Sequence, residues 1–77
     1  MMTRAYILVE TAVGTIETVQ TSLRELAGVR SVDIVTGDFD LILVAEAPNA
    51  HDIGRLVMRE IHGIEGIGQT TTCIVVG

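Results

Sequence analysis

The 77-residue chain has no tryptophan and only one each of tyrosine, phenylalanine, proline and cysteine. A single cysteine excludes an intrachain disulfide framework and fits a reducing compartment. No stretch reaches the roughly 18 consecutive apolar residues that a transmembrane helix needs, and the start of the chain does not read as a signal peptide. We therefore expect a soluble, cytoplasmic protein without membrane contact.

Positive charge is also scarce, because the formal net charge is −5 and all five basic residues are isolated arginines. Proteins that bind DNA or RNA meet the phosphate backbone with clustered lysine and arginine side chains. The charge pattern therefore argues against direct contact with nucleic acid.

Residues that could support catalysis or hold a metal are few. His51 and His62 lie at opposite ends of one expected helix, too far apart to share a metal ion. Cys73 has no second cysteine near it, so a buried structural thiol is the expected state. Asp38 and Asp40 form a close carboxylate pair without a neighbouring nucleophile. This favours a role in hydrogen bonds to the backbone of the turn over a role in acid-base catalysis. We expect no cofactor, no metal and no enzymatic activity.

What the chain does contain is a generous apolar fraction and an internal repeat. A content of 48% apolar residues is high for one small domain spanning residues 1–77, and it indicates a second buried surface such as a subunit interface. Shifting the chain by thirty-five residues places Tyr6–Val9 on Leu41–Val44 and Gly28 on Gly63. Two copies of a strand, a helix and a strand can close on each other as one compact domain.

The apolar runs and the residues that begin and end helices predict where these elements lie. Expected strands are Ala5–Val9, 29–36, Leu41–Ala45 and 67–76, and the helices follow Gly14 and Asn49, the second spanning 50–62. Asn49 suits a helix N-cap, and Gly28 and Gly63 suit left-handed positions that end each helix. The two unbroken apolar strands are expected at the sheet centre, covered on both faces.

This pattern predicts an α+β fold of the ferredoxin-like type, with element order βαββαβ and sheet order 4-1-3-2. Both helices cover one face, so the open face must be covered by a second copy, giving a dimer. The second helix carries more apolar residues than one sheet requires, namely Ile53, Leu56, Val57, Met58 and Ile61. Either the stripe is simply a wide core face, or the helix also meets a neighbouring dimer.

Four segments carry a resemblance to a known family: Ala5–Thr11, Gly28–Val32, the Gly-Asp-aromatic-Asp turn within Val35–Leu41, and Thr70–Val76. Together they resemble the effector-binding domain of the leucine-responsive regulator (Lrp/AsnC) family, also called RAM. The resemblance implies a ferredoxin-like fold, sheet-to-sheet dimers and further assembly into rings that hold small ligands, typically amino acids, between dimers. The regulators of this family carry an N-terminal helix-turn-helix, whereas residues 1–77 resemble the effector-binding domain alone. We therefore expect no DNA-binding domain, and DNA binding is not carried over.

The same resemblance implies where a ligand would be held: Gly37, Asp38 and Asp40 in the turn, with Thr70 and Thr72 in the last strand. The leading hypothesis is a stand-alone effector-binding and oligomerisation domain, with an amino acid or related metabolite as ligand. A full-length regulator of the same family is a further expected partner. Two alternatives remain open: a structural oligomerisation module without ligand, and an enzyme resembling the dimeric alpha/beta-barrel monooxygenases.

Overall fold

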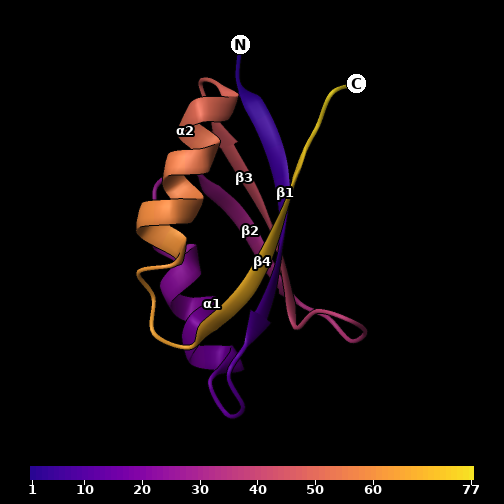
Figure 1. Cartoon of the computed structure of the whole chain (residues 1–77), viewed down its shortest axis with the longest axis vertical. Helices are drawn as coiled ribbons and strands as arrows, with labels where there is room; N and C mark the ends of the chain where they lie inside the picture. The colour runs from indigo at the N-terminus through magenta and orange to yellow at the C-terminus, as the bar shows by residue number, and fades with distance from the viewer.

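The computed structural model describes all 77 residues as one β-α-β-β-α-β unit, with both helices on the same face of a four-stranded antiparallel sheet (Figure 1). The strands are β1 Thr3–Thr11, β2 Val29–Ile34, β3 Leu41–Ala47 and β4 Ile67–Ile74. The helices are α1 Ile16–Arg24 and α2 Ala50–Arg55, which continues as a π-helical segment Leu56–Ile61. The sheet order β2-β3-β1-β4 is the expected 4-1-3-2 read from the other edge, so the ferredoxin-like prediction is confirmed.

The core lies between the sheet and the helices, and strand alternation builds it. Every second residue of the central strands faces the helices, because successive side chains of a strand point to opposite faces. The sheet contributes Ala5, Ile7, Val9, Val32, Leu41, Leu43, Ala45 and Ala47, and the helical side contributes Val19, Leu23, Ile53, Leu56 and Ile61. These thirteen are the buried residues of the chain, and none of them is polar.

The two central strands are covered by their own chain on one face only. Along β3 buried and half-buried residues alternate, so Ile42 and Val44 on the open face are only partly covered within one chain. Tyr6, opposite Val44 on β1, is 43% exposed. The strands are therefore apolar on both faces but covered on one, because the helices pack on a single side of the sheet.

The second helix begins as predicted and then changes its winding. Asn49 caps it, since its side-chain oxygen accepts a hydrogen bond from the Asp52 amide at 2.8 Å. In the π-helical segment the His62 amide donates to the Val57 carbonyl at 3.0 Å, a bond five residues back. The expected apolar excess divides here, because Leu56 is buried in the core whereas Met58 is 77% exposed.

The longer second helix also changes the offset between the two halves of the repeat. Gly63 is not in the left-handed region; the residue that takes the role of Gly28 (φ 90°) is Gly66 (φ 99°). The Val29 amide donates to the Leu26 carbonyl, and the Ile67 amide donates to the Ile64 carbonyl in the same way. The two halves therefore match after the helices with an offset of 38. The predicted offset of 35 was wrong there, because the second helical stretch is three residues longer than α1.

Residues 35–40 connect β2 to β3 and protrude from the body of the domain, while both chain ends lie at the opposite end of the sheet (Figure 1). The Val35 amide donates to the Asp40 carbonyl at 2.9 Å and closes the base of this hairpin. Neither helix is long and apolar enough to cross a lipid bilayer.

Candidate functional site

The hairpin presents two of the predicted site residues to solvent. Gly37 and Asp38 are both exposed, and Gly37 has a φ of 132°, which an L-residue with a side chain rarely adopts. The Asp38 carboxylate takes part in no side-chain hydrogen bond or ion pair of the chain. Asp38 is therefore a free carboxylate on a projecting turn.

Asp40 differs from Asp38, because one of its two carboxylate oxygens already accepts hydrogen bonds within the chain. One oxygen, Oδ2, accepts a hydrogen bond from the Thr11 amide at 2.8 Å and another from the Thr11 hydroxyl at 3.3 Å. These bonds tie the start of β3 to the end of β1, where the ladder between β1 and β4 also shifts register. Asp40 thus shapes the base of the hairpin.

The two predicted threonines lie at the β4 edge of the sheet. Thr70 pairs with Val9 and Thr72 with Ile7, so both belong to the face that carries the helices. The Thr70 hydroxyl lies 2.9 Å from Nε2 of His62, which follows the π-helical segment. His62 was not among the expected site residues, and no sequence pattern indicates its contact with Thr70.

One chain does not gather the five predicted residues into a pocket. The hairpin projects from the β2–β3 side of the sheet, whereas β4 forms the opposite edge. Four hollows mark the surface, and none is lined by Gly37, Asp38, Asp40, Thr70 or Thr72.

The open face of the sheet carries partly exposed apolar side chains. Two cross-strand pairs form its centre, Tyr6 with Val44 and Leu8 with Ile42. Contiguous apolar surface on a small protein indicates an interaction site, since exposing it to water is unfavourable. Cys73 pairs with Tyr6 on this face and is exposed, so the prediction of a buried thiol was wrong for the single chain.

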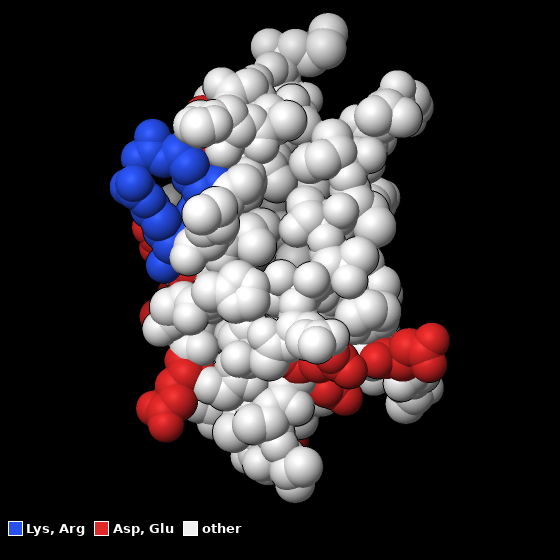
Figure 2. All heavy atoms as spheres, viewed as in Figure 1, with Lys and Arg blue, Asp and Glu red and all other residues white.

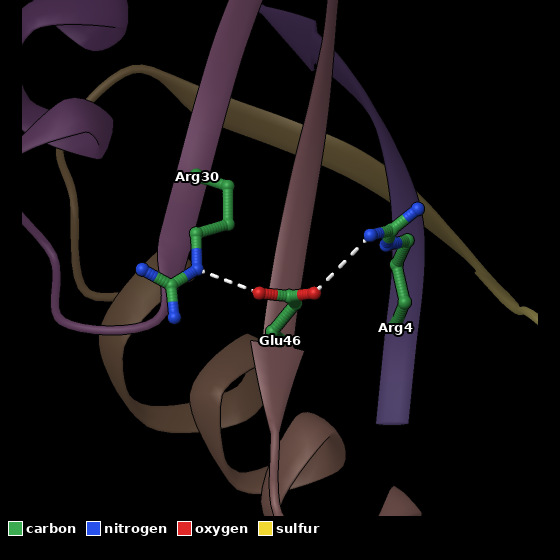
Figure 3. A network of polar contacts seen from close by, with 3 residues as sticks. All are labelled: Arg4, Arg30 and Glu46. Atoms are coloured by element: carbon green, nitrogen blue, oxygen red, sulfur yellow. Dashed lines mark hydrogen bonds and ion pairs between the residues drawn. The ribbon is translucent and has the colours of Figure 1, made fainter. Parts of the chain in front are cut away.

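A charged cluster closes one end of the open face. The Glu46 carboxylate of β3 lies between Arg30 of β2 and Arg4 of β1, at 2.7 Å from Arg30 Nε and 3.4 Å from Arg4 Nη2 (Figure 3). The hydrogen bond from Arg30 lowers the pKa of Glu46 below its ordinary value, with Arg4 acting in the same direction. The cluster links three strands, and no cluster of three or more His, Cys, Asp or Glu side chains suited to a metal occurs in the chain.

These features define the class of the protein: a small ferredoxin-like α+β domain with an exposed apolar sheet face and candidate ligand groups on its periphery. Residues 4–77 match the model of the Lrp/AsnC ligand binding domain. The chain therefore belongs to the Lrp/AsnC ligand-binding domain family.

Individual relatives agree with this assignment. An uncharacterized HTH-type transcriptional regulator of Pyrococcus horikoshii is 40% identical over 52 residues, which are 68% of this chain and 35% of the relative. The chain thus spans about a third of the length of such curated relatives. The crystal structure of a hypothetical protein from Pyrococcus horikoshii superimposes with a TM-score of 0.89 at 29% identity, covering 99% of this chain and 90% of that one.

A third comparison concerns the fold. A transcriptional regulator of Neisseria meningitidis, solved as a complex with L-methionine, has a TM-score of 0.89 at 21% identity over 97% of this chain and 50% of that one. At this identity the likeness establishes a shared fold.

Proposed function

We propose that the chain is an effector-binding domain that holds an amino acid or a related metabolite between subunits and thereby biases their assembly. The observation that carries the proposal is the match of residues 4–77 to a family of ligand-binding domains. The L-methionine complex of the Neisseria meningitidis regulator supports an amino acid as the ligand class. A full-length regulator of the same family is the proposed partner, since curated relatives are HTH-type regulators.

The geometry supports a site that subunits share. An amino-acid zwitterion needs an acceptor for its ammonium group and donors for its carboxylate, in a partly apolar cleft. Asp38 offers a free carboxylate, Gly37 an exposed backbone amide, and Thr70 and Thr72 offer hydroxyls. The hairpin and β4 lie at opposite edges of the sheet in one chain. We therefore propose that the hairpin of one chain and the β4 threonines of another form the site together.

The dimer is proposed to form through the open sheet face. Tyr6, Leu8, Ile42 and Val44 would be covered there by the same surface of a second copy, which buries apolar area that a 77-residue domain otherwise leaves in water. Rings of such dimers are the proposed higher assembly.

The residues buried between the sheet and the helices do not support the alternative of a monooxygenase-like enzyme. Enzymes of that type need a polar or aromatic cavity between sheet and helices, whereas the buried residues here are all aliphatic and include no polar group. A non-catalytic role in binding and regulation is therefore proposed.

A thermal-shift screen of the twenty amino acids, with L-methionine as the first probe, tests the function. A ligand present at a hundredfold its dissociation constant stabilises the folded protein by about 2.7 kcal/mol, which such a screen detects. Titration calorimetry on any hit, with the D-enantiomer as the matched control, gives the affinity and the stereospecificity. No shift with any amino acid would favour the ligand-free oligomerisation module.

A further inference from the structure

One contact between side chains joins the end of the second helix to the proposed ligand site. Nε2 of His62 lies 2.9 Å from the hydroxyl oxygen of Thr70, one of the two β4 threonines in that site. The His62 side chain is exposed and takes part in no other hydrogen bond of the chain. The two residues therefore form a polar pair at the edge of the site, and the proposed function has given His62 no role so far.

The backbone holds both members of this pair in place. His62 follows the π-helical segment, where its amide donates to the Val57 carbonyl at 3.0 Å, and the preceding Ile61 is fully buried. Thr70 lies opposite Val9 in the ladder between β4 and β1. Segments of π-helix within α-helices occur frequently at functional sites. The contact is therefore set by two regular elements of the fold.

A hydroxyl beside an imidazole can be arranged in two ways, and each arrangement offers a ligand a different group. If Nε2 is unprotonated, it accepts the hydrogen of Thr70, and the hydroxyl oxygen can then only accept a hydrogen bond from the ligand. If Nε2 carries a hydrogen, it donates to Thr70, and the hydroxyl hydrogen is free to be donated to the ligand. A protonated imidazole allows only the second arrangement, because both of its nitrogens are donors.

The second arrangement suits the carboxylate of an amino acid. Asp38 is the proposed acceptor for the ammonium group, so the threonine hydroxyls remain for the carboxylate, which requires donors. A protonated His62 makes Thr70 a donor and also brings a positive charge toward that carboxylate. Histidine is the side chain whose charge ordinarily changes between about pH 5 and 8. Protonation of His62 is therefore expected to strengthen binding of a carboxylate at Thr70.

No charged side chain forms an ion pair with His62. The charged groups of the adjacent elements are Arg59, Glu60 and Glu65 along its own segment, Glu17 of α1 and Glu10 of β1. β4 contains no charged residue, and Figure 2 shows uncharged atoms between the basic atoms over the second helix and the acidic atoms toward the hairpin end. Carboxylates and guanidinium groups ordinarily keep their charge between about pH 6 and 8, which leaves the two histidines as the side chains to compare.

We propose that His62 is a positioning residue of the ligand site, which orients the Thr70 hydroxyl toward the carboxylate of the bound amino acid and makes binding stronger at lower pH. The inference rests on the proposed function, to which it adds a residue and a condition that regulates binding. The affinity is highest where the imidazole is protonated, and it declines as the pH rises and the imidazole loses its proton.

Titration calorimetry with L-methionine on the full chain, at pH 6 and at pH 8, tests this role. The wild-type protein is expected to bind about fivefold more tightly at pH 6, because a neutral hydrogen bond becomes charge-assisted. His62→Gln keeps an amide donor near the position of Nε2 and cannot ionise, so its affinity should be nearly equal at the two pH values.

His51→Gln is the matched control, because it removes the other histidine from an exposed position on the same helix. This variant should retain the pH dependence of the wild-type protein. Wild-type pH dependence in His62→Gln overturns the inference, and so does a wild-type affinity that is equal at pH 6 and pH 8. Both results leave ligand binding itself intact.

A second measurement needs no ligand. The protonation of His62 can be followed by NMR correlation of its ring nitrogens with its ring protons in the wild-type protein, in Thr70→Val and in Thr70→Ser. Thr70→Val removes the hydroxyl at nearly constant volume and should shift the titration midpoint of His62, whereas Thr70→Ser keeps the hydroxyl and should restore the midpoint. Equal midpoints in the wild-type protein and Thr70→Val overturn the contact.

The two measurements separate this inference from the proposed function. If none of the twenty amino acids produces a thermal shift at either pH, the proposed function and the ligand role of His62 are both overturned. A shifted midpoint in Thr70→Val then still establishes the contact between the two side chains. If an amino acid binds equally well at both pH values, the proposed function stands and the role of His62 is overturned.

Discussion

Replacing the two hairpin aspartates should separate a structural acid from a ligand-binding one. Asp40 accepts hydrogen bonds from the Thr11 amide and hydroxyl, whereas Asp38 has no partner in the chain. Hydrogen bonds to a charged group contribute about 1.5–3 kcal/mol. We therefore expect Asp40→Ala to lower the free energy of unfolding by about that amount, since it also leaves the half-buried Thr11 amide without its acceptor.

Asp40→Asn is the matched control, because its amide oxygen can still accept from the Thr11 amide. A neutral hydrogen bond contributes about 0.5–1.5 kcal/mol, so this variant should retain part of the stability. Asp38→Ala should leave stability within about 0.5 kcal/mol of wild type. If Asp38 holds the ligand ammonium, its loss should weaken binding by roughly ten- to a hundredfold.

Urea denaturation at fixed protein concentration measures the stabilities, and titration calorimetry with the amino acid that the screen identifies measures the affinities. Wild-type stability in Asp40→Ala would contradict the assigned hydrogen bonds. Wild-type affinity in Asp38→Ala would remove that carboxylate from the ligand site.

Further predictions concern the interface, the charged cluster and the backbone. Val44→Glu places a charge at the centre of the open sheet face and should convert the dimer to a monomer at micromolar concentration in sedimentation velocity; an intact dimer would place the interface elsewhere. Glu46 has a lowered pKa in the folded state, so the stability it contributes is complete above its ordinary pKa of 4.5 and is lost as the pH falls below that value. Unfolding measured by circular dichroism from pH 7 to 3 should thus depend less on pH in Glu46→Gln, and equal slopes would argue against the cluster. Gly28→Ala should cost more than about 1 kcal/mol, because φ is 90° and the added Cβ would lie 2.9 Å from the Glu46 carbonyl oxygen; a neutral effect in urea denaturation would refute that strain.

The apolar pattern of the sequence determined the fold. Continuous apolar strands around Ile7 and Leu43, a helix cap at Asn49 and a positive-φ turn at Gly37 are local signals, and each reappears in the structure. Local signals suffice for these features because strand alternation, capping and positive φ depend on a few neighbouring residues. The resemblance in the Gly-Asp-aromatic-Asp turn further identified the family, which the match over residues 4–77 establishes.

Tertiary structure alone decided the rest. The sequence contained no signal for the π-helical segment, for a buried Leu56 next to an exposed Met58, or for the contact of His62 with Thr70. Asp38 and Asp40 lie two residues apart in the sequence, and the structure identifies Thr11 of β1 as the hydrogen-bond partner of Asp40. The sequence also did not show which arginines form ion pairs, because Glu46 contacts Arg4 and Arg30 from strands that are remote along the chain. Such contacts follow from the register of the sheet and the packing of the helices. Both depend on which residues are buried together from distant parts of the chain, and short sequence patterns do not encode this.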